Sequence, residues 1–514
     1  MSESSSSTIL IRGVNWVGDA VMTLPAVRAV KKAFPGAKVS LLVKPLVKPV
    51  FEGDPAIDEI IEYDERFRGI TGRLSLARLL GKRGFSHAIL LQNAFDAALL
   101  AFLAGVPERI GYDRDGRGLL LTRRVPFTGG DRKIHHIRYY LDLLNAAGIP
   151  AEYTHPWICL SGEEKRAARE RLAAMGRPVL GINPGATYGS AKRWFPERFT
   201  EVARRFISET GGSVVIFGGP KETDIAQEIH EAAAGHPLSA DSSSSLLNLA
   251  GKTSLRELMA LIAECDALLT NDSGPMHIAY AVGTPSVSLF GSTSPELTGP
   301  VGEGNVVLRK DMACSPCFER TCKNGDMKCM DALSGEEVYR AIGDILPRRR
   351  AVFFDRDGTL CRDAHYLNKW EDFELFSDLD SLQLLKARGF VLIGVSNQSG
   401  IHRGLVQEAF VREVNSVFTS RYGFDAFYYC PHGPGEGCPC RKPAPSMLLT
   451  ARGEHRIDLR RSYVVGDKDD DMLLARAVGA KGILVKTGKQ AGSDYADHIA
   501  ENLRDAVEYI LVHE

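Results

Sequence analysis

The chain has 514 residues, which is enough for about three or four domains of ordinary size. Hydrophobic residues make up 44% and charged residues 25%, a balance that is typical of globular proteins and excludes a mostly disordered, collagen-like or disulfide-scaffold chain. The formal net charge of -1 argues against a nucleic-acid coat protein, so no nucleic-acid partner is expected.

Residues 1–8 are polar and lack the apolar core of a signal peptide. No run of about 18 consecutive apolar residues occurs in the sequence, so no transmembrane segment is predicted. We therefore expect a cytoplasmic protein. Ten cysteines in that compartment indicate free thiols or metal ligands rather than structural disulfides.

Three series of alternating strands and helices follow along the chain. The expected strands span 9–12, 39–43 and 87–91 in the first series, 179–182, 213–217, 267–270 and 286–290 in the second, and 351–354, 391–395, 426–429, 463–465 and 482–485 in the third. Such alternation predicts parallel sheets in doubly wound α/β domains. Boundaries near 165–175 and 347–350 divide the chain into domains at 8–170, 171–346 and 350–514.

In the first series, Gly18 and Asp19 stand between the strand at 9–12 and a helix expected near 20–33. A helix N-terminus offers free backbone donors to an anion, although Asp19 taken alone could equally be a helix cap. The stretch Arg109–Arg138 carries more basic than acidic residues. It indicates either a solvated face or a site for a phosphorylated or anionic partner.

The second series holds two more loops between a strand and a helix. NPGAT at 183–187 follows its first strand, with Lys192 beyond it, and NDSGPMH at 271–277 follows another strand. Loops of this kind can hold a diphosphate at a helix N-terminus. Taken alone, Glu222 would be a surface charge and His277 a structural histidine.

Four segments resemble the ADP-heptose:lipopolysaccharide heptosyltransferases, and most of all the second-heptosyltransferase type. They are NWVGDAVMTLPA at 15–26, ERIGYDRDGRGLLLT at 108–122, NPGATYGSAKRW at 183–194 and TNDSGPMHIA at 270–279. The resemblance covers roughly 8–345. It implies two Rossmann-like domains in a GT-B arrangement, with the acceptor on the first domain and the sugar nucleotide on the second.

This resemblance also implies an inverting transfer from ADP-L-glycero-D-manno-heptose. Asp19 would deprotonate the acceptor hydroxyl, and Lys192 would neutralise charge on the departing diphosphate. The positions that match donor contacts are Thr187, Lys192, Glu222, Asp272, Ser273, Gly274 and His277. The acceptor would be a phosphorylated heptosyl-Kdo-lipid A, whose phosphates the basic stretch Arg109–Arg138 would attract, so peripheral association with the inner membrane is expected.

In the third series, the strand at 351–354 delivers Asp355 and Asp357 to the carboxyl end of a sheet. An Asp-x-Asp pair alone could be a turn or a helix cap. Later strands end at Ser396 and Asp467, and Lys442 lies between them. Carboxylates close to a substrate phosphate suit Mg²⁺.

In that order these residues resemble the haloacid-dehalogenase phosphohydrolases. The resemblance implies that Asp355 is the nucleophile and Asp357 the general acid/base. It further implies that Ser396 binds the transferring phosphoryl group, that Lys442 neutralises charge, and that the Mg²⁺ ligands are Asp355, Asp357 and Asp467.

A cysteine-rich loop lies just before Lys442. Cys430, His432, Cys438 and Cys440 offer three thiolates and one imidazole, the ligand set of a closed, structural Zn²⁺ site. Ordering of this loop would place Arg441 and Lys442 beside the substrate.

Together with DRDGTL, SNQSGIHRG and CRKPAPSM, the loop resembles the heptose bisphosphate phosphatases, which are close relatives of histidinol phosphatases. The resemblance covers about 350–490 and implies removal of the 7-phosphate from D-glycero-D-manno-heptose 1,7-bisphosphate. The expected substrate contacts are Asp363, Tyr366, Ser396, Asn397, Gln398, Ser399, Arg441 and Lys442.

Two alternatives stay open: the third domain could act on histidinol phosphate or another small phosphomonoester, or one half could be only a binding module. A second group of cysteines near the end of the second domain has no assigned role. Cys314, Cys317, Cys322 and Cys329 could bind Zn²⁺, remain free thiols or form a redox pair.

Overall fold

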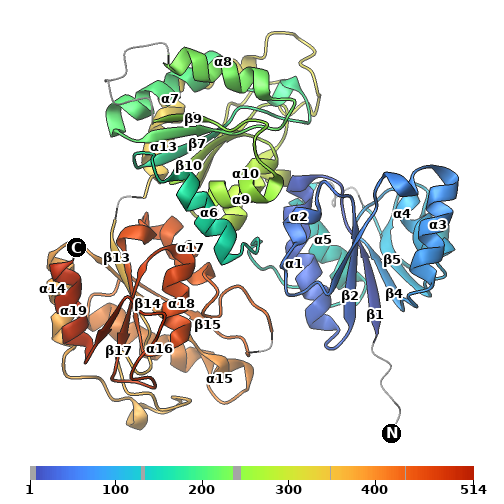
Figure 1. The fold of residues 1–514 in the computed structure, drawn as a ribbon. Coiled ribbons are helices and arrows are strands. Elements are labelled where there is room, and N and C mark those ends of the chain that lie inside the picture. The colour runs from blue at the N-terminus through green and yellow to red at the C-terminus, as the bar shows by residue number, and fades with distance from the viewer. Residues whose placement is uncertain (1–6, 129–132, 235–244, 348, 435, 514) are drawn as a thin grey trace, which may run out of the picture. The chain divides into compact units, whose positions relative to one another are not determined.

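The computed structural model describes residues 7–128, 133–234, 245–347, 349–434 and 436–513 (Figure 1). The chain divides into two compact units, Met1–Ile345 and Leu346–Glu514. Most of the polar N-terminal segment and residues 129–132 of the basic stretch Arg109–Arg138 lie outside the described residues. No helix in the described ranges combines the length and the apolar character needed to cross a bilayer.

The first domain is a six-stranded parallel sheet in the order β3-β2-β1-β4-β5-β6. Its strands are β1 (Thr8–Arg12), β2 (Lys38–Val43), β3 (Glu59–Glu62), β4 (His87–Leu90), β5 (Glu108–Asp113) and β6 (Arg123–Pro126). Its helices are α1 (Val17–Ala33), α2 (Lys48–Phe51), α3 (Gly69–Gly81), α4 (Phe95–Leu103) and α5 (His136–Ala146).

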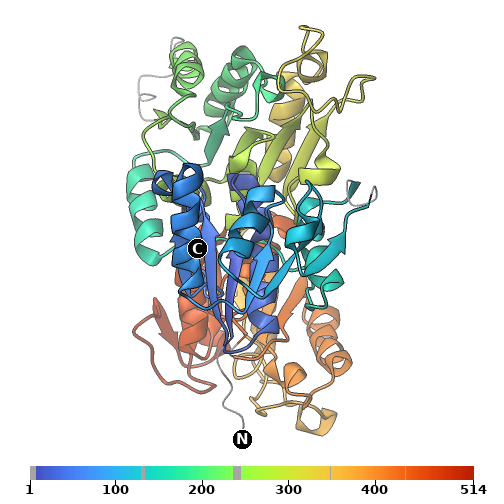
Figure 2. The same ribbon diagram turned by 90° about the vertical axis from the view of Figure 1, so that its right-hand side faces the viewer.

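Helices cover both faces of this sheet (Figures 1 and 2). In β1, Ile9 and Ile11 pack toward α1 and α5, while Leu10 belongs to the cluster under α3 and α4. This alternation follows from the two-residue period of a strand, and burial on both faces explains the continuous apolar runs of these strands.

The second domain repeats the design with the sheet order β12-β11-β10-β7-β8-β9. Its strands are β7 (Val179–Asn183), β8 (Ser213–Ile216), β9 (Leu246–Asn248), β10 (Ala267–Asn271), β11 (Ser286–Phe290) and β12 (Asn305–Arg309). Its helices are α6 (Gly162–Leu172), α7 (Pro196–Thr210), α8 (Thr223–Ala234), α9 (Leu255–Glu264), α10 (Gly274–Val282), α11 (Pro295–Thr298), α12 (Lys328–Asp331) and α13 (Gly335–Ile345). Capping boxes at Ser161 and Ser254 define where α6 and α9 begin.

The third domain has the order β15-β14-β13-β16-β17-β18. Its strands are β13 (Ala351–Phe354), β14 (Val391–Asn397), β15 (Ala426–Cys430), β16 (Tyr463–Gly466), β17 (Lys481–Val485) and β18 (His498–Ala500). Its helices are α14 (Leu382–Ala387), α15 (Ser399–His402), α16 (Glu408–Arg421), α17 (Ser446–His455), α18 (Asp469–Val478) and α19 (Leu503–Val512).

Counted within each domain, all three sheets have the strand order 3-2-1-4-5-6, and every strand pair in the described residues is parallel. The predicted α/β class with parallel sheets is therefore confirmed. In this topology the chain reverses its direction of progress between strands 1 and 4, and ligands bind at the carboxyl ends of the strands at that point. Candidate sites are thus expected after β1, after β7 and β10, and after β13 and β16.

Candidate active sites

Asp19 lies in the first turn of α1, directly after β1. The helix begins at Val17, three residues earlier than the sequence suggested, so Asp19 is part of the helix rather than of the turn before it. A carboxylate in a first turn is stabilised by the positive end of the helix dipole. Its Oδ1 lies 3.5 Å from Nδ1 of His136 on α5, and about a quarter of the side chain is exposed. Asp19 is thus accessible, with an imidazole beside it.

The N-terminus of α1 meets α10 of the second domain. A Cβ atom on Gly18 would lie 2.6 Å from Cδ2 of His277, so only glycine permits this approach. Nδ1 of His277 shares a hydrogen bond with the hydroxyl of Tyr280 at 3.0 Å.

Burial lowers the pKa of His277 to about 4, so the ring is neutral at pH 7. The charged or titratable groups that act on it are Asp272, Asp19, His135 and Lys192. The histidine therefore contributes a neutral ring at the place where Asp19 of the first domain approaches the 271–277 loop of the second domain.

The donor residues predicted on β10 and α10 lie together. Asp272 follows β10, is almost fully buried, and its Oδ2 lies 2.5 Å from Nζ of Lys192 and 2.5 Å from Oγ1 of Thr293. Ser273 accepts a hydrogen bond from the Asn183 amide at 3.3 Å, and Gly274 begins α10. The lysine thus stands beside a helix N-terminus with its charge already paired, an arrangement able to hold an anion.

The other two predicted donor contacts lie on neighbouring loops. Thr187 is exposed in the loop after β7. Glu222 precedes α8, and its Oε2 accepts a hydrogen bond from the Gly219 backbone N–H at 2.8 Å. A Cβ atom on Gly185 would lie 2.0 Å from Cδ of Glu222, so this carboxylate packs directly against the 183–187 loop.

In the third domain, Asp355 follows β13 and is 3% exposed. Its Oδ1 lies 2.8 Å from Nζ of Lys442 and accepts a hydrogen bond from the Arg356 N–H at 2.8 Å. Nζ of Lys468 is 3.7 Å from Oδ2. Burial alone would favour the neutral acid, but the charges of Lys442 and Lys468 hold the pKa of Asp355 below its usual value. An ionised, buried carboxylate is the state that a nucleophile requires.

Asp471 is a site residue that the sequence reasoning missed. It lies in the first turn of α18, and its Oδ1 is 2.6 Å from Nζ of Lys442. Burial raises the pKa of Asp471 to about 7. The available signal was the acidic run Asp469–Asp471 at the start of α18, two residues after Asp467 at the end of β16.

Asp355, Asp467 and Asp471 offer carboxylate oxygens within 4.8 Å of one another. Of the three predicted Mg²⁺ ligands, this cluster includes Asp355 and Asp467. The side chain of Asp357 lies outside it: Oδ2 accepts hydrogen bonds from Nη2 of Arg356 at 3.0 Å and from Nε2 of Gln398 at 2.8 Å. Asp357 is thus oriented by donors, as a proton-transfer group would be.

The remaining predicted substrate contacts lie at the end of β14 and in the segments that follow β13, β14 and β15. Nε2 of Gln398 also donates to Oγ of Ser396 at 2.7 Å, and Oδ1 of Asn397 accepts from the Lys442 N–H at 3.0 Å. The other positions are Asp363, paired with Lys489 at 2.9 Å, Tyr366, packed against Gly400, Ser399 at the start of α15, and Arg441, which donates to the His432 carbonyl at 3.3 Å.

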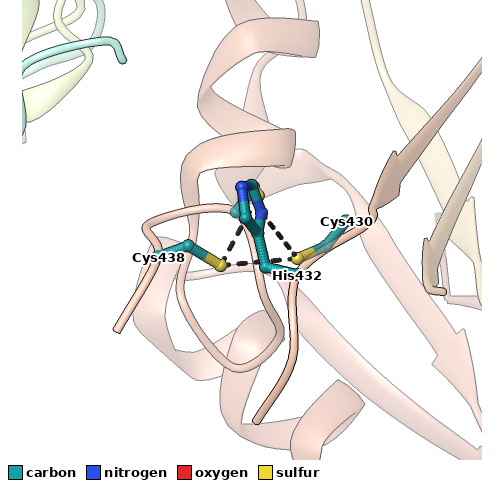
Figure 3. A group of neighbouring side chains, drawn as sticks. Cys430, His432 and Cys438 are labelled. Carbon is teal, nitrogen blue, oxygen red and sulfur yellow. Dashed lines mark hydrogen bonds between the residues drawn. The ribbon is translucent and has the colours of Figure 1, made fainter. Parts of the chain in front are cut away.

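Cys430, His432, Cys438 and Cys440 converge at the end of β15, as Figure 3 shows for the first three. Nδ1 of His432 lies 3.5 Å from Sγ of Cys430 and 3.3 Å from Sγ of Cys440, and the sulfur atoms of Cys430 and Cys438 are 3.4 Å apart. Three sulfurs and one imidazole nitrogen at these separations fit the tetrahedral ligand set of Zn²⁺.

Comparison with known proteins agrees with both halves. A family model described as glycosyltransferase family 9 (heptosyltransferase) matches residues 73–328, and a HAD-hydrolase-like model matches 439–506. Lipopolysaccharide heptosyltransferase 2 of Escherichia coli K12 is 32% identical over 354 residues, which cover 66% of this chain and 95% of that protein.

The structure of the E. coli ADP-heptose lps heptosyltransferase II aligns with a TM-score of 0.57 at 28% identity, over 66% of this chain and 98% of that one. The D-glycero-beta-D-manno-heptose-1,7-bisphosphate 7-phosphatase of Pasteurella multocida is 40% identical over 173 residues, 30% of this chain and 94% of that protein. The predicted GT-B and haloacid-dehalogenase relationships are thereby confirmed. The chain belongs to both families, as a fusion of a family 9 heptosyltransferase with a HAD-like heptose bisphosphate phosphatase.

Proposed function

We propose that the first two domains transfer heptose from ADP-L-glycero-D-manno-heptose to a phosphorylated heptosyl-Kdo-lipid A acceptor. The name of the E. coli relative supports the donor. The observation that carries the proposal is the meeting of α1 and α10, because it brings a candidate base on one domain to an anion-binding helix N-terminus on the other.

In this mechanism Asp19 takes the proton from the acceptor hydroxyl as the new glycosidic bond forms with inversion at the sugar carbon. The departing ADP gains negative charge on its diphosphate. Lys192 and the free N–H groups of the α10 N-terminus stabilise that charge. Since Asp272 pairs with Lys192 at 2.5 Å, it holds the ammonium in place until the diphosphate shares it.

The test is heptose transfer by Asp19→Asn, a change that keeps the shape and removes the base. Transfer falls by about 100-fold or more, whereas ADP-heptose binding is retained because Asp19 serves the acceptor. Transfer at the wild-type rate by Asp19→Asn or Asp19→Ala would reject Asp19 as the base. If the wild-type chain binds the donor but transfers no heptose, this half is a binding module.

We propose that the third domain hydrolyses the 7-phosphate of D-glycero-D-manno-heptose 1,7-bisphosphate through an aspartyl phosphate. Asp355 attacks phosphorus, and Asp357 donates a proton to the leaving sugar oxygen. Asp357 then takes a proton from the water that hydrolyses the intermediate. The ion pair between Asp355 and Lys442, with Oδ1 2.8 Å from Nζ, is the observation that carries this mechanism.

The acidic cluster fits Mg²⁺. Its three carboxylates offer hard oxygen ligands within 4.8 Å of one another, and Oδ2 of Asp471 is buried without a hydrogen-bond partner among the described residues. Bound there, Mg²⁺ supplies positive charge to the transferring phosphoryl group. Asp355 and Asp467 would hold it, with Asp471 beside them. A structural Zn²⁺ would occupy the site of Cys430, His432, Cys438 and Cys440.

Phosphate release tests this half. The chain is assayed with Mg²⁺ against both anomers of heptose 1,7-bisphosphate and against histidinol phosphate, with Asp355→Asn as the inactive control. We expect preference for the β-anomer, following the name of the Pasteurella multocida relative. Preference for histidinol phosphate would support the other phosphomonoesterase reading and separate the two halves into different pathways.

We further propose that the enzyme works in the cytoplasm at the inner membrane. Leu74 and Leu79 on α3 and Phe102 and Leu103 on α4 are exposed apolar side chains, and α3 also carries exposed arginines. Apolar groups flanked by cations suit an anionic lipid surface. Cosedimentation with anionic vesicles tests this, and equal binding of Leu74→Ser/Leu79→Ser and the parent chain would contradict it.

A further inference from the structure

The segment that joins β12 to α13 carries four cysteines and packs onto the second domain at the end of β11. The Phe318 N–H donates to the Ser292 carbonyl at 2.7 Å, and the Ser315 hydroxyl donates to the Gly291 carbonyl at 2.7 Å. A Cβ atom on Gly291 would lie 3.0 Å from Sγ of Cys329. The segment is thus anchored at both ends on one short stretch of backbone.

Backbone donors gather around one of these sulfur atoms. The N–H groups of residues 324–327 donate toward Sγ of Cys322. The other three cysteines lie near enough to Cys329 to interact with it electrostatically. All four are free thiols. Amide donors around a sulfur stabilise negative charge, as they do around metal-bound thiolates.

We propose that Cys314, Cys317, Cys322 and Cys329 bind one thiophilic divalent ion, Zn²⁺ in the first instance, at a second site distinct from the one at residues 430–440. Four thiolates in one segment supply a complete tetrahedral set with no open position, so the site is structural. No three of these sulfurs lie within 4.8 Å of one another, so binding requires the exposed side chains of Cys314 and Cys317 to turn toward Cys322 and Cys329.

The position of the segment gives the site a consequence for the transferase, and this part rests on the proposed function. Between Cys317 and Cys322, the Phe318 carbonyl accepts a hydrogen bond from the Tyr188 hydroxyl at 2.8 Å, and the Arg320 carbonyl accepts from the Ala191 N–H at 3.0 Å. A Cβ atom on Gly189 would lie 2.1 Å from the Arg320 oxygen. The cysteine segment therefore supports the backbone that carries Thr187 and Lys192.

Nζ of Lys192 lies 4.7 Å from the Tyr188 ring, so the support reaches the cation assigned to the diphosphate. An ion held by all four thiolates would fix the Phe318 and Arg320 carbonyls and thereby the loop from 187 to 192. The ion acts through this loop without touching the substrate, which makes the cysteines positioning residues.

The test is the zinc content of the full-length chain after removal of loosely bound metal. We expect two zinc ions per chain, falling to one in Cys322→Ser and to one in Cys438→Ser, and to none when both changes are combined. Cys159→Ser, a thiol outside both groups, keeps two. Cys314→Ser, at an exposed position, is the second variant if Cys322→Ser fails to fold.

Two zinc ions retained in both Cys314→Ser and Cys322→Ser would overturn the proposal. A wild-type chain that holds only one zinc ion, which Cys438→Ser removes, would overturn it as well. The same holds if thiol titration then finds a disulfide among Cys314, Cys317, Cys322 and Cys329. Cobalt substitution adds a spectroscopic check, because Cys438→Ser should leave the charge-transfer bands of a four-thiolate site. Cys322→Ser should raise the KM for the sugar nucleotide several-fold and leave phosphate release unchanged. The metal measurements stand even if the substrate assignment fails.

Discussion

The contact between Gly18 and His277 yields a test of how the two transferase domains meet. In Gly18→Ala, the new methyl group would lie 2.6 Å from Cδ2 and 2.9 Å from Nε2 of the imidazole. Position 18 is inside α1, where alanine is the residue that a helix prefers, so the backbone itself accepts the change. Any loss must come from the collision with the ring.

The size of the effect follows from how firmly the ring is held. His277 is 4% exposed, and its Nδ1 is tied to the Tyr280 hydroxyl at 3.0 Å, so the ring moves aside only by losing that hydrogen bond. Inserting a methyl group into a packed site costs about 1–3 kcal/mol. If that cost falls on the assembled active site, kcat/KM for transfer drops by about 5- to 150-fold.

The assay is ADP release from ADP-heptose in the presence of acceptor, measured beside phosphate release by the same preparation. The phosphatase belongs to a separate compact unit, so its rate is an internal control for concentration and handling. Gly162→Ala, at the start of α6, is the matched substitution because nothing lies within 4 Å of its new Cβ. Transfer by Gly18→Ala at the wild-type rate would refute the contact and the domain arrangement drawn from it.

Three further outcomes are expected. Burial depresses the pKa of His277 to about 4 from an ordinary 6.5, so the unfolded chain takes up the extra proton first as the pH falls. About 3 kcal/mol of transferase stability that is present above pH 6.5 is therefore lost toward pH 4. His277→Gln should flatten this part of a profile of thermal unfolding against pH, and equal slopes for the variant and the parent chain would contradict the assignment. Lys442→Met leaves the buried carboxylates of Asp355 and Asp471 without this cation, so phosphatase activity disappears. The free energy of unfolding of this domain in denaturant falls by about 3–5 kcal/mol. An unchanged free energy of unfolding would show that the two ion pairs are not formed. Asp471→Asn raises the Mg²⁺ concentration for half-maximal phosphate release by about tenfold or more, and an unchanged Mg²⁺ titration would remove Asp471 from the metal site.

Much of this architecture could be predicted because a parallel sheet leaves two signals in the sequence, one in its strands and one in the loops that follow them. Apolar runs mark the central strands, and polar loops directly after them mark the ligand-binding edge, so Asp19, Asp272 and Asp355 were found without coordinates. Among the described residues, six strands were missed. Four of them, β3, β6, β9 and β18, have only three or four residues and give little periodic signal. The longer β5 and β12 were missed because charged or polar residues stand at both of their ends.

The internal pairings of the sites were beyond sequence reasoning. The stretch from Lys468 to Asp471 looks like a charged helix start, and only the fold places Asp471 against Lys442 while its neighbours stay accessible. In the same way, the contact of Lys192 with Asp272 joins residues far apart in the chain. A residue type and its spacing suggest a role, but the partner that sets its charge comes from tertiary structure.

The helix α13 has a consequence for the order in which the chain is assembled. It packs against α7, β10 and β11 and buries Val338, Ile342 and Ile345. The hydrophobic core of the second domain is therefore incomplete until this last helix emerges from the ribosome. The central strand of the third sheet begins soon afterwards, at Ala351. Since synthesis runs from the N-terminus and domains fold as units, one hydrophobic core is completed just before the next is started. The short connector thereby spares the growing protein a period in which two incomplete cores are exposed together.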